Sequence, residues 1–491
     1  MTEKNINAVH LLIMGFTLTV AAVLRLVGIH FGLPQAFHTD ETILVYATRQ
    51  FFQGDFNPHN FYYPSLIMYV MHLVQRIVLI FSNGEFSTNT LFLICRITVA
   101  AFGVATIIVT YRMGLKLFNR TIALLSAFVM TLLPLHVINS HLATTDVPLT
   151  FFILLTLSSM FILVERGAWK SYLLCGVLFG LTVSTKIPGA VIFLPILIAH
   201  FYRVQLETGL KYGALLRRLS WFHWIVSGAM GILGGLVVFV VLSNFQSIVQ
   251  WINSTFAVDV WLDHPQRIVA AVTPQRLKFA VIAFFALFLF LITSPIWRLH
   301  LHKLLLLIGA SLAAFFMTTP FALLDYKTFI KDFLHQMVVS QTTWGGMFYQ
   351  APPGLITNFR YLYQEFGWIL FTFFLAGTVL LLRKASIHRI LLLSVLWVYF
   401  LYISSWKILF DRYMTPVLPL MSLITLYGLD TLMGGLLKNL RLKSILKRSL
   451  HIVLYALVLV LPLGNMLYKS IDYDRYLLKK STRTLAYEWG V

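Results

Sequence analysis

The sequence predicts an all-α, polytopic membrane protein, and three observations carry this prediction. Of the 491 residues, 59% are hydrophobic and only 11% are charged, whereas about 25% of the residues in a soluble domain are charged. Apolar runs of about 20 residues recur from end to end, and each is long enough to cross a bilayer core of roughly 30 Å. The runs are continuous rather than alternating, which argues against a membrane β-barrel.

The apolar runs predict about 13 transmembrane helices. The first run continues past Ala21 to Gly32 without a small-residue cleavage pattern, so we expect a helix with a cytoplasmic N-terminus rather than a signal peptide. We place the helices near residues 8–31, 91–117, 121–140, 147–165, 171–186, 188–203, 223–243, 278–297, 304–322, 366–383, 389–405, 414–432 and 449–467.

We expect one membrane domain over residues 1–467, with an extracytoplasmic tail over 468–491. The tail, "YKSIDYDRYLLKKSTRTLAYEWGV", resembles the start of a soluble domain, and we expect that domain either to be lost or to follow in a longer protein. Three long outside loops interrupt the membrane domain, over residues 32–90, 244–277 and 323–365.

The apolar stretch 61–81, "FYYPSLIMYVMHLVQRIVLIF", carries His72, Gln75 and Arg76. Such polar side chains favour a helix that lies along the membrane interface rather than one that crosses it. If the stretch does not span, basic clusters such as those at 112–120, 203–218 and 438–448 all fall in the cytoplasm. The positive-inside rule expects this distribution, so we predict an interfacial helix.

The acidic residues have the opposite distribution. The same topology leaves four of the 18 acidic residues in the cytoplasm and places the other 14 outside. The net charge of +20 is therefore mainly a signal of topology, with basic loops beside anionic lipid headgroups, and not of nucleic-acid binding. The outside acids indicate chemistry on the extracytoplasmic face of the cell membrane.

Asp40 and Glu41 form an acidic pair just after the first apolar run. Neighbouring residues on a helix point about 100° apart, so only one of the two needs to face a site. A carboxylate at the interface can act as a general base or help to hold a divalent metal. The alternative interpretation is that Thr39 and Asp40 cap the helix that follows.

Asp146 lies in a short outside turn, "INSHLATTDVPLTFF", where a charge is costly unless it is solvated or paired. Because it precedes Pro148, it also fits a helix cap. Coming from another outside turn, it could share one cavity with Asp40.

Three cations are candidates for binding an anion. Lys186 lies at the break between two short apolar segments, in "GLTVSTKIPGAVIFLPIL", where it needs a partner such as a phosphate or must extend to the headgroups. Lys407 and Arg412 lie between two helices in "SWKILFDRYMTPVLPL". Arginine is suited to bidentate phosphate binding.

Two function classes fit these residues. In the first, a carboxylate activates an acceptor and Lys or Arg stabilises the phosphate leaving group of a lipid-linked donor. In the second, the protein is a transporter or flippase for a lipid-linked or anionic substrate. Transporters place functional charges near the middle of the membrane, whereas the acids here lie at outside helix ends, which favours the first class.

The motifs resemble those of the GT-C glycosyltransferases of glycosyltransferase family 39, which includes protein O-mannosyltransferases and the lipid A aminoarabinose transferase. The resemblance starts with "LRLVGIHFGLPQAFHTDE" and "GDFNPHNFYYPSL". It continues, in the family's order, through "HLATTDVPLTFF", "GLTVSTKIPGAVIFLP", "PFALLDYKTFIKDF" and "KILFDRYMTPVLPL". It implies a scaffold of 13 helices with two juxtamembrane helices in the first outside loop.

The resemblance also implies an activity, namely inverting transfer of a sugar from a polyprenyl-phosphate carrier to a protein, lipid or glycan. It implies catalytic roles for Asp40, Glu41 and Asp146, and donor-phosphate contacts for Lys186 and Arg412. His59 and Tyr63 are expected in the cavity. Some family members hold a metal and others do not, so the resemblance predicts no definite metal; if a divalent ion such as Mg²⁺ or Mn²⁺ binds, its ligands would be Asp40, Asp146 and His59.

Overall fold

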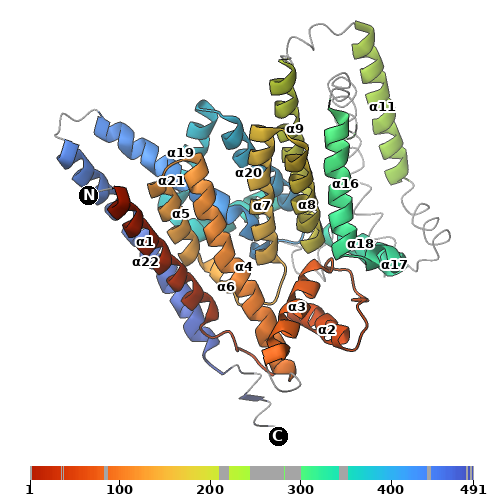
Figure 1. Cartoon of the computed structure of the whole chain (residues 1–491), viewed down its shortest axis with the longest axis horizontal. Coiled ribbons are helices and arrows are strands. Elements are labelled where there is room, and N and C mark those ends of the chain that lie inside the picture. The colour runs from red at the N-terminus through yellow and green to blue at the C-terminus, as the bar shows by residue number, and fades with distance from the viewer. Residues whose placement is uncertain are drawn as a thin grey trace.

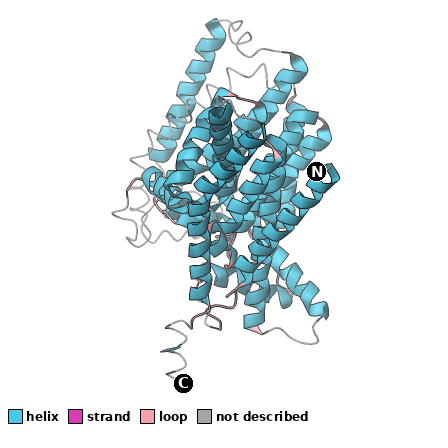
Figure 2. Ribbon diagram, turned by 90° about the vertical axis from the view of Figure 1, so that its left-hand side faces the viewer, coloured by secondary structure: helices cyan, strands magenta, loops and turns pink. Residues whose placement is uncertain are grey.

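The computed structural model describes most of the chain as helices and connecting turns. The described residues are 3–34, 36, 38–81, 87–209, 221–243, 281, 283, 300–341, 352–438, 444–480, 482, 485, 486 and 489. They contain helices and no strand (Figure 2), which confirms the all-α class. The expected span at 278–297 and the expected loop at 244–277 fall almost entirely outside these residues.

Helices, most of them long, form the body of the protein (Figure 1). They are α1 (Glu3–Leu26), α4 (Thr88–Leu117), α5 (Arg120–Leu132), α6 (Pro134–Ser140), α7 (Asp146–Arg166), α8 (Trp169–Thr185), α9 (Phe193–Thr208), α11 (Trp221–Ser243), α16 (Leu301–Thr318), α19 (Gly354–Arg383), α20 (Ile387–Ser404), α21 (Leu418–Lys438) and α22 (Ser444–Leu477). Two 3₁₀ segments, η1 (Ile187–Ile192) and η4 (Asp411–Val417), precede α9 and α21.

Within the described residues, nine helices are long and apolar enough to cross a membrane, and a tenth candidate is a bent pair. The polytopic fold is thus confirmed, but the count of 13 is not. Helices α8 and α11 occupy the expected spans at 171–186 and 223–243, although neither is among the nine.

The bent pair corrects the expected continuous span at 121–140. Helices α5 and α6 meet at an angle of 59°. Pro134, the first residue of α6, has no N–H to donate into the preceding turn, which breaks the helix there. The freed N–H of Leu135 donates instead to Oε2 of Glu365 in α19, at 2.9 Å. A break in a membrane helix is tolerated where a neighbouring element satisfies the backbone in this way.

Local sequence signals set several helix ends. The side chain of Ser87 accepts from the backbone of Thr90 to cap α4, and Asn119 accepts from Ile122 to cap α5. Helices α7 and α9 end at Gly167 and Gly209, whose φ values are 62° and 65°. Glycine adopts this left-handed conformation without steric cost, which stops both helices.

The first expected loop contains two helices, α2 (Thr39–Phe52) and α3 (Leu66–Phe81), which pack against each other. They lie at the lower end of the bundle in Figure 1, at the opposite end from the N-terminus. Helix α3 has 16 residues and is not among the nine long apolar helices. The expectation of two helices in this loop is thus confirmed, and their position beside the membrane stays a prediction.

The described part of the third expected loop meets the first loop. It contains α17 (Phe321–Leu324) and α18 (Tyr326–Gln341), beside α2 and α3 in Figure 1. Nδ2 of Asn57 donates to Oδ2 of Asp325 at 2.9 Å, and the N–H of Phe61 donates to Oδ2 of Asp332 at 2.6 Å. These hydrogen bonds hold the two loops together beneath the bundle.

Helices α8 and α16 approach to backbone contact. A Cβ atom added at Gly176 would collide with the carbonyl oxygen of Leu307, and one added at Gly180 would collide with that of Ser311. Small residues four apart allow this packing in membrane helices, where dispersion and close fit replace the hydrophobic effect.

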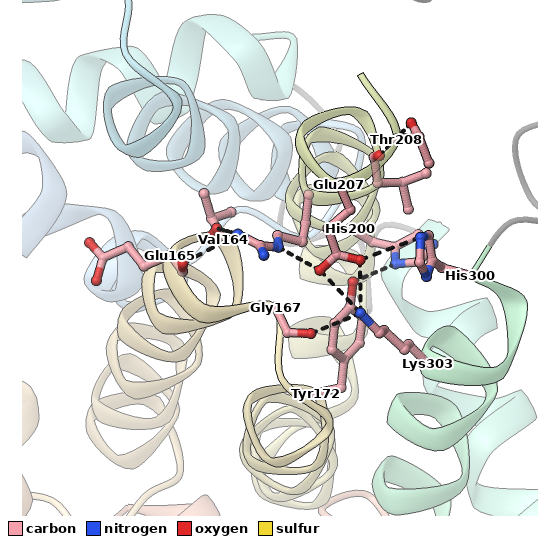
Figure 3. Close-up of polar contacts among 11 residues, drawn as sticks. Val164, Glu165, Gly167, Tyr172, His200, Glu207, Thr208, His300 and Lys303 are labelled. Carbon is pink, nitrogen blue, oxygen red and sulfur yellow. Dashed lines mark hydrogen bonds and ion pairs between the residues drawn. The ribbon is translucent and has the colours of Figure 1, made fainter. Parts of the chain in front are cut away.

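An ion-pair network ties the helices at the end opposite to α2 and α3 (Figure 3). Glu207 of α9 binds Arg203 and Lys303, both at 2.8 Å, and His300 at 3.3 Å. Lys303 of α16 also donates to the carbonyl oxygen of Gly167, at 3.0 Å. The network therefore connects α9 and α16 with the turn between α7 and α8.

We expect this network to contribute modestly to stability. The Glu207 and Lys303 side chains are 21% and 17% exposed, so their coupling should be about 1 kcal/mol, near the upper end for exposed pairs. A double-mutant cycle of Glu207→Gln and Lys303→Gln, followed by thermal unfolding in detergent, measures it. Additive destabilisation by the two substitutions would contradict the expectation.

Candidate functional site

Asp40 lies in the first turn of α2, but its carboxylate does not cap the helix. His38 is the N-cap residue, and its side chain makes no capping hydrogen bond. Oδ2 of Asp40 lies 2.8 Å from Nη2 of Arg412 in η4, and both side chains are 17% exposed. The capping interpretation therefore does not account for Asp40, whose charge is paired with a cation far away in the chain.

Asp146 is paired in the same way. It is the first residue of α7, and the N-cap residue Thr145 makes no side-chain cap. Oδ1 of Asp146 accepts from Nζ of Lys186 at 2.6 Å, and its Oδ2 lies 4.0 Å from Nε of Arg412. Arg412 thus approaches both acids. We call Asp40, Asp146, Lys186 and Arg412 the four-charge site.

Interruptions in the helices bring these residues together. Lys186 ends α8 in an extended conformation, and Pro188 follows it in η1. Arg412 lies in η4, a 3₁₀ segment that packs against α7 and contains Pro416. Because proline cannot continue an α-helical hydrogen-bond ladder, it favours such breaks. The cations are thereby presented where the α-helices stop.

Aromatic rings surround the cations. The Lys186 ammonium lies 4.7 Å from the ring centre of Tyr413 and 5.6 Å from that of Tyr63. The Arg412 guanidinium lies 4.8 Å from the ring of Phe410. Burial raises the pKa of Tyr63 well above its ordinary value, and the carboxylates of Asp40 and Asp146 add to this effect. Tyr63 therefore lies beside the four-charge site as a neutral phenol.

The side chain of Glu41 is paired with a residue outside the four-charge site. Its carboxylate binds Arg96 of α4 through two contacts of 2.8 Å, and both side chains are fully buried. Oε1 of Glu41 also accepts from the N–H of Ala143, at 2.8 Å. Arg96 donates in addition to the carbonyl oxygens of Ile29 and Phe31. These contacts fit a residue that positions α2 and the turn before α7, rather than one that touches a substrate.

Two other expected site residues, His59 and Lys407, have partners outside the four-charge site. Nε2 of His59 lies 2.7 Å from Oδ2 of Asp55, and both side chains are about half exposed. This hydrogen bond lowers the pKa of Asp55. The side chain of Lys407 is exposed, and its backbone N–H donates to Ser340 of α18. A phosphate contact by Lys407 stays a prediction.

The described residues do not fit the expected metal site. No group of three or more His, Cys, Asp and Glu side chains among them is placed to hold a metal ion. Asp40 and Asp146 each face a cation, and His59 faces Asp55 instead. A dication beside Lys186 and Arg412 would also be repelled. Asp40, Asp146 and His59 stay ligands only on the condition that a metal binds, and we derive no step through a metal.

Sequence reasoning missed two residues of this region. Nε2 of His38 lies 3.1 Å from Nη1 of Arg412, and Arg96 holds Glu41 in place. Neither residue belongs to a recognisable spacing. The one available signal for Arg96 was its position inside an apolar run, where a buried cation requires a partner.

Comparison with known proteins identifies the fold. Residues 64–226, which include Asp146 and Lys186, match the dolichyl-phosphate-mannose-protein mannosyltransferase family. A search of curated proteins found no match. Among solved structures, the apo oligosaccharyltransferase of Archaeoglobus fulgidus aligns with a TM-score of 0.50 and 14% identity. That alignment covers 96% of this chain and 60% of the archaeal chain.

A second solved relative is ArnT from Cupriavidus metallidurans. Its apo structure aligns with a TM-score of 0.48 and 14% identity, covering 96% of this chain and 75% of ArnT. The ArnT structure bound to undecaprenyl phosphate aligns with a TM-score of 0.46 and 13% identity, covering 97% of this chain and 76% of ArnT. The chain is thus similar to the dolichyl-phosphate-mannose-protein mannosyltransferase family over residues 64–226, and its helical fold is similar to that of the archaeal oligosaccharyltransferase.

Proposed function

We propose that the protein transfers a sugar from a polyprenyl-phosphate donor to an acceptor at the membrane surface. The observation that carries this proposal is the four-charge site, in which Asp40 pairs with Arg412 at 2.8 Å and Asp146 pairs with Lys186 at 2.6 Å. The matched family, named for a dolichyl-phosphate-mannose donor, supports the same donor class.

The charges of the site fit a phosphate. Two cations balance two carboxylates, so a bound phosphate competes with the carboxylates for Lys186 and Arg412. Phosphate offers several acceptor oxygens to a guanidinium and an ammonium. Donor binding would therefore loosen the Asp40–Arg412 pair and release the Asp40 carboxylate for chemistry.

In the proposed reaction, Asp40 removes the proton from a hydroxyl or amine of the acceptor. The acceptor atom forms a bond to the anomeric carbon while the bond from that carbon to the phosphate oxygen breaks on the opposite face, which inverts the configuration. The electron pair of the broken bond stays on the polyprenyl phosphate, where Lys186 and Arg412 stabilise the negative charge. Asp146 orients Lys186.

We propose that the end carrying α2 and α3 faces the extracytoplasmic side of the cell membrane, with the N-terminus in the cytoplasm. The ion-pair network of Arg203 and Lys303 at the opposite end supports this orientation, since basic residues favour the cytoplasmic side. The location of the four-charge site at helix ends also favours transfer over the transporter alternative.

Mass spectrometry of cell-envelope glycans and glycolipids tests the proposal. Cells that express the chain should contain a new glycoconjugate that is absent from cells with Asp40→Asn. Unchanged glycoconjugates despite confirmed expression, together with movement of a lipid-linked substrate across vesicles, would favour the transporter alternative instead.

A further inference from the structure

His38 lies directly beside the four-charge site, although the proposed reaction assigns it no role. Its carbonyl oxygen accepts from the N–H groups of Glu41 and Thr42, which begins α2. Its side chain turns away from the helix end, and Nε2 lies 3.1 Å from Nη1 of Arg412.

This contact determines which ring nitrogen of His38 carries the proton. A guanidinium has only donors, so Nε2 must accept and the ring must be neutral with its hydrogen on Nδ1. Burial lowers the pKa of His38, and the nearby Asp40 carboxylate offsets only part of this effect. The neutral form is thus the one that the surroundings favour.

Nδ1 of His38 is buried and has no hydrogen-bond partner among the residues that the structure describes. A buried N–H without an acceptor is unfavourable, so most native structures supply one. The acids near His38, namely Asp40, Glu41 and Asp146, are already paired with the cations Arg412, Arg96 and Lys186. A bound ligand can supply the missing acceptor.

We propose that the Nδ1–H group of His38 donates a hydrogen bond to a phosphate oxygen of the lipid-linked donor. This inference rests on the proposed function and adds a third, uncharged donor to Lys186 and Arg412. The phosphate is favoured over an acceptor hydroxyl because the same imidazole contacts Arg412, the residue suited to bind phosphate. Arg412 thereby orients the ring toward its own ligand.

Two substitutions distinguish the role of Nδ1 from that of Nε2. In His38→Asn the amide nitrogen can replace Nδ1–H, whereas the contact with Arg412 is lost. In His38→Gln the amide can reach Arg412, whereas the Nδ1–H donor is lost. The full chain in nanodiscs is titrated with undecaprenyl phosphate, and with undecaprenol as the matched lipid without phosphate. Unfolding temperatures equal to that of the unsubstituted chain establish that both variants are folded. The variant His38→Ala removes both contacts and serves as the reference for their combined loss.

We expect His38→Gln to weaken undecaprenyl phosphate binding about tenfold or more, because a hydrogen bond to a charged group is worth at least that factor. His38→Asn should stay within about threefold of the unsubstituted chain, and undecaprenol binding should not distinguish the variants. Equal Kd values for Asn and Gln, or a loss confined to Asn, would overturn the inference. Unchanged Kd values for undecaprenyl phosphate together with an altered KM for the acceptor would also overturn the inference, since His38 would then contact the acceptor. If the unsubstituted chain binds no undecaprenyl phosphate, the proposed function fails, and the inference fails with it.

Discussion

Asp40→Asn is expected to lower sugar transfer by about 100-fold to 10,000-fold, the range typical of a lost general base. The amide has nearly the same size as the carboxylate but cannot take a proton from the acceptor. Undecaprenyl phosphate should still bind, because Asn removes the negative partner that Arg412 has at 2.8 Å and leaves the guanidinium available. Transfer from a labelled polyprenyl-phosphate sugar and Kd for undecaprenyl phosphate are the two measurements.

A matched control is Asp472→Asn, which makes the same chemical change at an exposed position of α22. It should leave both transfer and binding unchanged. Full activity of Asp40→Asn would show that Asp40 is not the base. Loss of binding together with transfer would assign Asp40 to the structure of the site instead.

Breaking the buried pair of Glu41 and Arg96 should produce the largest loss of stability. Both side chains are fully buried, and two 2.8 Å contacts join them. Removing one partner leaves an uncompensated buried charge, which costs about 3–5 kcal/mol. We expect Glu41→Gln and Arg96→Met each to lower the unfolding temperature strongly. Thermal unfolding in detergent measures this change.

The double variant Glu41→Gln/Arg96→Met should lose less than the sum of the single variants, since no charge is then left unpaired. The control is Lys116→Met, which breaks an exposed pair with Glu165 at 2.6 Å, with side chains 49% and 36% exposed. That change should cost at most about 1 kcal/mol. Similar losses for Arg96→Met and Lys116→Met would contradict a structural role for the buried pair.

Local patterns predicted the parts of the fold that depend on local chemistry. The polar residues His72, Gln75 and Arg76 favoured an interfacial helix in 61–81, and α3 is a short helix that packs against α2. The break at Pro134 was not predicted, because the apolar run continues through it. The freed N–H of Leu135 is satisfied by Glu365, a neighbour that is distant in sequence.

In the four-charge site, too, local sequence predicted some features, whereas others depend on residues that are distant in the chain. Helical geometry indicated that only one of Asp40 and Glu41 needs to face a site, and their carboxylates indeed meet different partners. Sequence alone could not tell which, because Arg412 and Arg96 approach them only after folding. The juxtaposition of Asp146 with Lys186 likewise arises from the packing of α7 against α8.

The close approach of α8 and α16 at Gly176 and Gly180 restricts how the protein can move. Backbones in contact cannot slide past each other without separating. The two helices should therefore move together as one rigid body. Lys186 follows the end of α8, and α17 and α18 follow the end of α16. A movement of α17 and α18 that opens a path to the four-charge site would therefore also shift Lys186. Substrate access and the binding of an anion by Lys186 would then change together.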